Sequence, residues 1–248
     1  MDQPSQGLEL LKIGIQSGWS LSSIKKHPLI MDRLGTDAWK RLKQEYPELR
    51  AVYETKIDQA LRAEVQAMFK KDQWKALGAF LKFSDQKQNQ YAENKFAPHS
   101  EAQMTQFVAI HPEHGYPGER RIGNNFWMST ILSHHNSISQ AYNQKDQWYA
   151  QIRPLLEQSL HLGEMSPFEF ALIDEWYRLS VADPETVTYG LVDYPRHGSL
   201  AQVNELRTAA FLRPIETRNG LLDIERTTSL QLHIEETAWI DGIISVEE

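Results

Sequence analysis

The 248-residue chain contains no cysteine. It therefore has no disulfide bonds, no thiolate nucleophile and no cysteine-ligated zinc site. A chain without cysteine is compatible with a reducing compartment, and the opening stretch Met1–Ser5 lacks the basic and apolar regions of a secretory signal peptide. We therefore expect a cytoplasmic protein.

Long apolar segments and a basic surface are also missing. No apolar run approaches the roughly 20 residues that a membrane-spanning helix needs, so we expect no membrane partner. Basic pairs such as Lys25-Lys26 and Lys70-Lys71 are short and scattered, and the formal net charge is -7. A nucleic-acid footprint normally forms a basic patch, so we expect no nucleic-acid partner. An acidic surface mainly keeps a protein soluble, although it could also face a basic partner protein.

The common cofactor and nucleophile motifs are absent as well. The chain has no Gly-x-x-x-x-Gly-Lys phosphate loop, no Gly-x-Gly-x-x-Gly turn and no Gly-x-Ser-x-Gly elbow. Nucleotide-dependent chemistry and the common serine hydrolases are therefore unsupported, and we expect no cofactor.

The residues that are present predict a mainly α fold. Hydrophobic residues make up 41% of the chain, with seven Trp and nine Phe available for a core. Apolar residues between Leu49 and Phe69 recur at three- and four-residue spacing and predict an amphipathic helix of about six turns. We expect a multi-helix globular bundle with at most a small β element near 187–192 or 230–234, where short alternating stretches occur.

A polar stretch at 84–90 divides the chain. It could be a linker or a polar helix, and it places a predicted boundary between an N-terminal helical region, 1–83, and a C-terminal helical domain, 84–248. The two could also pack as one unit. Beyond the boundary we expect a Pro/Gly-rich loop at 111–118 and helices over 123–142 and 147–162.

Two further signals predict where helices begin. Ser166-Pro167-Phe168-Glu169 combines an N-cap serine, a proline at the first helical position and a glutamate placed for a capping box, so a helix should run from there to about Ser180. The hexad that starts at Lys71 recurs at Lys145 with Asp-Gln-Trp in common. We expect Asp72 and Asp146 each to cap a helix start.

Five of the nine histidines lie between His99 and His135. Two of them, His111 and His114, frame the predicted loop with Glu113 between them. The spacing occurs in some metal sites, but no recognised ligand pattern surrounds it, so the prediction is a turn without metal.

The predicted helix 123–142 carries polar groups on its apolar face. At 100° per residue, His135 falls in the middle of the arc formed by the large apolar side chains, alongside Asn124. The two residues are either the floor of a pocket or core groups that bond to each other or to the backbone, because unsatisfied buried polar groups cost about 1–3 kcal/mol each. A third candidate, Asp174, lies four residues before Arg178, and this spacing predicts an exposed ion pair unless a pocket forms there.

The order of short motifs from Ala109 onward resembles the bacterial DUF6624 family, whose function is unknown. The resemblance covers about the last 150 residues. Each motif is short, so the resemblance depends on the order of the motifs more than on any one of them. Its matching pieces are Glu113-His114-Gly115-Tyr116-Pro117, Gly123, a His-containing helix end, Gly163-Glu164, Leu172-Ile173-Asp174, Tyr189-Gly190, Pro214-Ile215-Glu216, and Asp223 with Arg226.

The chain also departs from the family pattern. Gln-His is expected where this chain has His134-His135-Asn136, Asp-Arg becomes Asp174-Glu175, and Tyr-Gly-Thr-Gln becomes Tyr189-Gly190-Leu191-Val192. Turn-forming and packing residues survive better than polar ones. The resemblance therefore implies a divergent member with a retained fold rather than a retained reaction.

Two functions follow from these features. The first is a cytoplasmic protein-binding or regulatory protein of the immunity or antitoxin kind, suggested by the acidic charge, the helical pattern and the missing cofactor motifs. The alternative is a divergent His-dependent hydrolase with a site formed by the 111–118 loop and the 123–142 helix. In that case His114 or His135 would be the general base, Asp174 its orienting partner and Arg226 an anion clamp. The remaining candidate binding residues are His111, Glu113, Tyr116, Asn124 and Tyr189.

Overall fold

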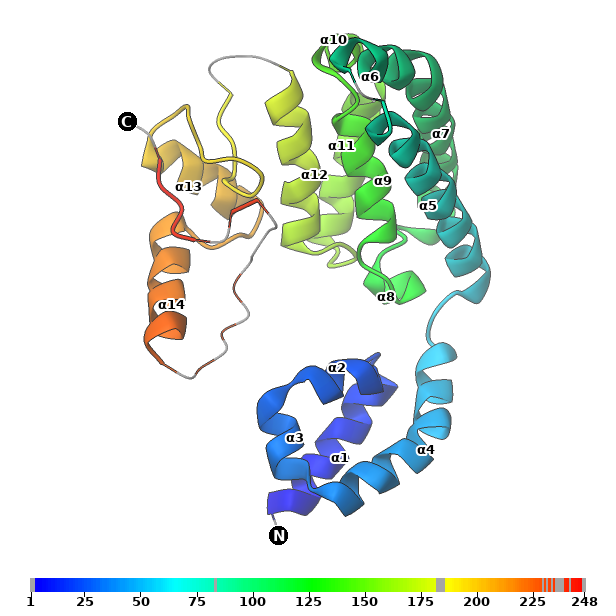
Figure 1. The fold of residues 1–248 in the computed structure, drawn as a ribbon, viewed down its shortest axis with the longest axis vertical. Helices are drawn as coiled ribbons and strands as arrows, with labels where there is room; N and C mark the ends of the chain where they lie inside the picture. Colours follow the sequence, from blue (N-terminus) through cyan, green and yellow to red (C-terminus); the bar gives the residue numbers. More distant parts are fainter. Residues whose placement is uncertain are drawn as a thin grey trace. The chain divides into compact units, whose positions relative to one another are not determined.

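The computed structural model describes residues 3–82, 84–181, 186–228, 230, 232, 234, 239–240 and 242–246. Every regular element in these residues is a helix (Figure 1), which confirms the mainly α multi-helix prediction. Residues 187–192 contain no strand. Of the other stretch with a possible β element, Gln231 and His233 lie outside the described residues.

The chain divides into two compact units. The first comprises Met1–Arg62 together with Arg121–Gly123, and the second comprises Ala63–Arg120 together with Asn124–Glu248. The boundary predicted at 83/84, between two regions that could also pack as one unit, stays a prediction.

The first unit has a small apolar core of its own. Ser20 accepts a hydrogen bond from the amide of Ser23 and so caps the second helix. The fully or almost fully buried side chains come from three of the four helices and form one cluster: Leu8, Ile15, Ile24 and Leu42. The helices are α1 (Gln3–Gln16), α2 (Leu21–Lys26), α3 (Pro28–Leu34) and α4 (Thr36–Glu54).

The long helix predicted over Leu49–Phe69 is wrong, because the chain breaks between α4 and α5 (Gln59–Phe80). At the break, the Asp58 carboxylate accepts the amide of Leu61 at 2.9 Å, while the Asp58 amide donates to the carbonyl of Arg121 at 2.8 Å. A helix interior would use that amide for its own ladder. The apolar period continues across the break, so periodicity alone does not reveal it.

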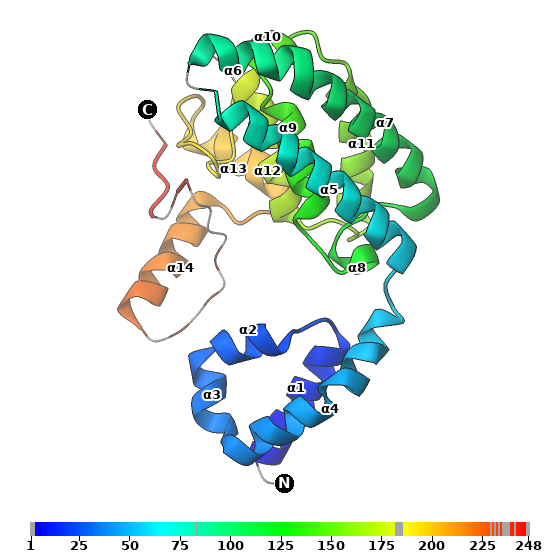
Figure 2. The same ribbon diagram turned by 45° about the vertical axis from the view of Figure 1, so that its right-hand side comes forward.

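The second unit holds the remaining helices, except that the last two residues of α8 belong to the first unit. Figures 1 and 2 both place α9 and α12 side by side, and this pair makes the most extensive helix–helix contact of the unit. The polar stretch at 84–90 is mostly helical, which settles the choice between linker and helix. The bounds are α6 (Asp85–Tyr91), the π-helix η1 (Ala92–Phe96), α7 (Ala97–His114), α8 (Glu119–Ile122), α9 (Trp127–Asn136), α10 (Gln140–Asn143), α11 (Trp148–His161), α12 (Pro167–Ser180), α13 (Leu200–Ala209) and α14 (Ile215–Thr227).

Two local predictions need correction. The stretch 111–118 is not a loop throughout, because α7 continues through Pro112 to His114 and the chain turns only at Gly115, where φ is 72°. The helix predicted over 123–142 is two helices. The Asn124 side chain accepts the amides of Phe126 and Trp127 at 3.0 and 2.7 Å, and α9 begins at Trp127.

Other element predictions are confirmed. The helix expected over 147–162 is α11, and α12 begins after Ser166 with both hydrogen bonds of a capping box to Glu169. Asp146 accepts the amides of Trp148 and Tyr149, as an N-cap should. Asp72 does not, because it lies in the middle of α5. Among the described helices, none is both long and apolar enough to cross a bilayer.

Candidate functional site

Asp174 is a buried carboxylate with four hydrogen bonds. The predicted ion pair with Arg178 is confirmed, but Asp174 is buried rather than exposed. Its side chain is 1% exposed. One oxygen accepts the hydroxyl of Tyr149 at 2.7 Å and Nε of Arg153 at 2.9 Å. The other accepts Nε of Arg178 at 2.6 Å and the hydroxyl of Tyr189 at 2.9 Å.

The charge of Asp174 is stabilised by these partners. Burial acts to raise the pKa of this carboxyl, but the positive charges of Arg178 and Arg153 and the tyrosine hydrogen bonds outweigh burial and lower the pKa. Because both oxygens are saturated by four donors, Asp174 has no free lone pair for orienting a catalytic histidine. The cluster joins α11, α12 and the segment after α12, and it acts as a structural node.

Two buried glutamates near this cluster have raised pKa values. Burial raises the pKa of Glu175 to about 7, against the opposing hydrogen bonds from the amides of Leu191 and Gly190. Burial likewise raises the pKa of Glu169 to about 7, although Ser166 and the hydroxyl of Tyr116 donate to its carboxylate. Both groups therefore exchange protons near neutral pH, and Glu169 also lines a groove.

His111 and Tyr116 lie in one buried neighbourhood at the end of α7. Nε2 of His111 is 2.8 Å from the hydroxyl of Ser159, and burial lowers the pKa of the imidazole. Tyr116 donates its hydroxyl to Glu169, and the Phe107 ring contacts both the His111 and Tyr116 rings. The arrangement is a packed core that leaves no side of either ring open.

His135 is a buried core group. The residue is 1% exposed, Nδ1 is 2.9 Å from the hydroxyl of Ser100, and Nε2 is 3.3 Å from the carboxylate of Asp146. Burial acts to raise the pKa of Asp146, but the bonds from His135 and from two backbone amides outweigh it and lower the pKa. Both imidazole nitrogens are occupied, as the core interpretation of this residue expects, although its partners are not Asn124.

The remaining predicted residues lie apart. His114 ends α7 with Nε2 3.8 Å from the carboxylate of its exposed neighbour Glu113. Asn124 caps α9 and Arg226 lies in the last turn of α14. Of the nine predicted residues, the structure joins Asp174 to Tyr189 and places His111 near Tyr116. The hydrogen bonds of His135 and of Asp174 go to residues other than each other, His114 and Arg226.

A groove of about 420 Å³ runs between α9 and α12. Its walls combine aromatic rings with hydroxyl groups, and its described lining includes no Lys or Arg. The lining residues are Asn125, Phe126, Ser129, Thr130, Ser133, His134 and Ser137 from the α9 side and Ser166, Phe168, Glu169, Leu172, Trp176 and Trp239 on the other.

Within this groove, His134 forms an ion pair that the sequence-based candidates did not include. Its Nδ1 is 2.6 Å from Oδ2 of Asp72, a residue with no exposed surface. Asp72 had been assigned to a helix cap, and His134 sits beside the candidate His135. In the sequence, this site is marked only by two consecutive histidines. The sequence does not show which of the two rings lines a groove and which is buried in the core.

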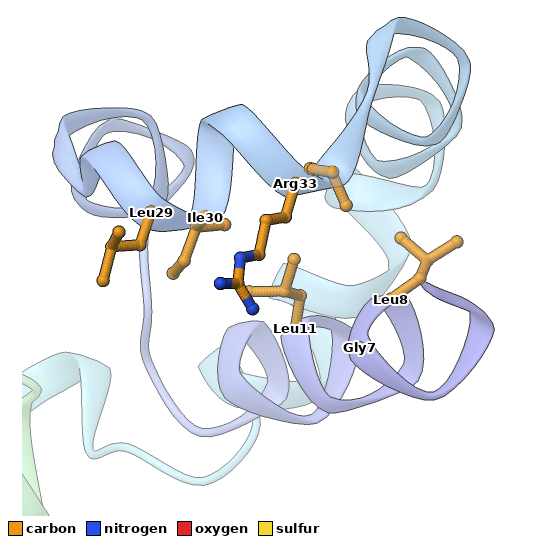
Figure 3. A pocket seen from close by; sticks show the side chains of 7 residues that line it. Gly7, Leu8, Leu11, Leu29, Ile30 and Arg33 are labelled. Atoms are coloured by element: carbon orange, nitrogen blue, oxygen red, sulfur yellow. The ribbon is translucent and has the colours of Figure 1, made fainter. Parts of the chain in front are cut away.

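A second cavity lies within the first unit, between α1 and α3. It has a volume of about 580 Å³ and is lined almost entirely by aliphatic side chains (Figure 3). Figure 3 shows the Arg33 side chain extending from α3 toward Leu11 of α1, alongside Ile30. In the part of the chain that the structure describes, Arg33 has no ion pair or hydrogen bond.

Neither cavity has the ligands of a metal centre, since the described residues contain no group of three or more His, Asp or Glu side chains arranged to hold an ion. No family model matches the chain, and neither a curated protein nor a solved structure is similar to it. The DUF6624 resemblance therefore stays a prediction, and the functional argument depends on the geometry of the two cavities.

Proposed function

We propose that the protein is a cytoplasmic protein-binding, regulatory protein of the immunity or antitoxin kind, and that its first unit holds a helical segment of the partner in the α1–α3 cavity. The observation that carries this proposal is an open aliphatic cavity with the Arg33 guanidinium at its wall, a group that has no partner among the described residues. Amphipathic helices bind such grooves through apolar side chains spaced three or four residues apart.

The charge of the first unit indicates which partner fits. Residues 1–62 carry ten Lys and Arg against eight Asp and Glu, whereas residues 63–248 carry 16 against 25. The acidic excess of the chain therefore lies entirely outside 1–62. A partner helix with aliphatic anchors and an acidic side chain aimed at Arg33 would complement this unit in shape and charge.

The hydrolase alternative based on His114, His135, Asp174 and Arg226 has less support. Both nitrogens of His135 are bonded inside the core, and Asp174 is saturated by its four donors. A general base needs a nitrogen within reach of a proton on the substrate or on water.

The proposal is tested by affinity purification from native lysate at low and at high salt, with a matched set of variants. Leu29 lines the cavity and is 51% exposed, whereas Leu10 is 61% exposed on α1 and does not line it. We expect Leu10→Asp to retain a salt-sensitive partner, and Leu29→Asp and Arg33→Glu to weaken binding at least ten-fold, which corresponds to about 1.4 kcal/mol. Failure of any protein to co-purify, or equal recovery by all four proteins, would contradict the proposal.

A further inference from the structure

Asp72 positions one imidazole of the second unit. It is a fully buried residue of α5, its Oδ2 lies 2.6 Å from Nδ1 of His134, and its Oδ1 has no hydrogen-bond partner in the described chain. A buried carboxylate beside Nδ1 favours the tautomer in which Nδ1 carries the proton. The lone pair of the imidazole is then on Nε2.

Nε2 of His134 is the nitrogen available for chemistry. It has no hydrogen bond to any described residue, its side chain is 31% exposed, and the residue lines the α9–α12 groove. The neighbouring His135 also lies beside an aspartate, but it is sealed and both of its nitrogens are bonded. Of these two adjacent histidines, His135 is therefore structural, and His134 is accessible to a ligand.

The lining of the groove also contains hydroxyl groups. Ser133 is buried there, and its hydroxyl has no hydrogen-bond partner in the described chain. Thr130 precedes His134 by four residues and so lies on the same face of α9. Native proteins rarely leave a buried hydroxyl unsatisfied, so the Ser133 group marks a place where a ligand or water is expected to accept or donate a hydrogen bond.

The lining also limits the substrate. Aromatic rings of Phe126, Trp176 and Trp239 form apolar walls, and no described lining residue is a Lys or Arg that could bind a phosphate or carboxylate. Hydroxyls are weaker than cations in stabilising a developing negative charge. A neutral substrate with an apolar or aromatic group and a good leaving group therefore fits better than a phosphate ester or a peptide amide.

We propose that the α9–α12 groove is a hydrolytic site for neutral carboxylic esters, in which His134 is the general base and Asp72 the positioning residue. A water oxygen bonds to the ester carbonyl carbon as its proton moves to Nε2 of His134. The carbonyl then re-forms, the bond to the alcohol oxygen breaks, and the proton on Nε2 goes to that oxygen. The products are one carboxylic acid and one alcohol, and the histidine returns to its starting state.

The activity test uses the purified full chain with 4-nitrophenyl butyrate as the probe. We expect saturable hydrolysis that falls at least 100-fold in kcat/KM in His134→Asn, because general base catalysis contributes about 10²–10⁴-fold. Asp72→Asn should lower kcat and leave KM unchanged, a separation that loss of packing alone would not produce. The matched control is His197→Asn, since His197 is exposed and does not line the groove. Hydrolysis that does not saturate, or that His134→Asn leaves within two-fold of wild type, would overturn the proposal.

A second measurement does not depend on the choice of ester. Long-range ¹H–¹⁵N correlation spectra of the wild-type protein should show His134 with its proton on Nδ1 and an unprotonated Nε2 at pH 8. A proton on Nε2 would remove the general base. Melting temperatures establish that each variant is folded. Ester hydrolysis and partner capture are separate measurements, so failure here is distinguishable from failure of the α1–α3 proposal.

Discussion

The two oxygens of Asp174 accept hydrogen bonds from two tyrosine hydroxyls and two arginines, so an amide at this position removes the negative charge and replaces one acceptor oxygen with a donor. We expect Asp174→Asn to lower the free energy of unfolding by about 3 kcal/mol, at the lower end for a broken buried pair because water partly reaches both arginines. Urea denaturation measures the change. Asp193→Asn, in an exposed pair with Arg196, is the control and should stay within about 1 kcal/mol of wild type.

Glu169 gives stability a specific pH dependence. Its pKa is about 7 in the folded protein and 4.5 ordinarily, so between these values the folded state holds a proton that the unfolded chain has lost. The free energy of unfolding therefore falls as pH rises through this window. Glu169→Gln keeps the capping-box acceptor and removes the titration. Relative to wild type, we expect the variant to gain up to about 3 kcal/mol between pH 4.5 and pH 7.5.

The comparison of unfolding curves across pH must isolate this one group. Burial lowers the pKa of His99 and His111, and these rings change stability with pH in the opposite direction over the same range. Only the difference between variant and wild type reports on Glu169. Glu113→Gln, at an exposed side chain, should give a difference that does not vary with pH, and a flat difference for Glu169→Gln would show that the buried carboxyl is ionised throughout.

At the scale of single elements, two glycines with positive φ follow helices but have different surroundings. Gly115 follows α7 with φ of 72°, and Gly163 follows α11 with φ of 65°. A Cβ on Gly115 would meet the carboxylate of Glu164 at 2.5 Å, whereas a Cβ on Gly163 would meet nothing within 4 Å. We expect Gly163→Ala to cost about 1 kcal/mol from its positive φ alone. Gly115→Ala should cost more, because φ of 72° with ψ of -163° is a conformation that essentially only glycine adopts. Equal losses in thermal denaturation would contradict this view of the turn.

Elements also show how far the sequence could predict the structure. The hexad at Lys71 and its copy at Lys145 contain the same Asp-Gln-Trp, and one aspartate caps α11 as predicted while Asp72 lies inside α5 beside His134. Helix existence, the α12 capping box and the stop at Gly163 were predictable because they depend on neighbours in sequence. The Asp72–His134 pair was not, because its residues are 62 apart along the chain and only tertiary packing brings them together.

On the scale of the whole molecule, the two compact units have separate cores. Leu42 is fully buried in the first unit and Leu156 in the second. We expect Leu42→Ala, which should cost about 2–5 kcal/mol, to reduce hydrogen-exchange protection of amides in α1 and α4 while α9 and α12 keep theirs. Leu156→Ala should produce the reverse pattern. Equal loss of protection in both units from either variant would show that they unfold together.

The division into units was only partly predictable. The polar composition at 84–90 suggested a boundary, yet these residues form α6 within the second unit. The contacts divide the chain earlier, between Arg62 and Ala63, inside a continuous α5 where no change in composition marks the place. The candidate site was also only partly predictable. The number and spacing of the histidines pointed to the α7–α9 region, but they did not show that His134 lines a groove while His135 is buried.

The short segment Arg121–Gly123 belongs to the first unit, where its carbonyl groups accept hydrogen bonds from the Asp58 amide and the Arg62 guanidinium. These acceptors are translated about sixty residues after their donors. When the ribosome has released Met1–Arg62, that unit is still missing two of its hydrogen-bond acceptors. The order of synthesis therefore differs from the order of assembly, and the N-terminal unit is completed only while the chain of the second is already being made.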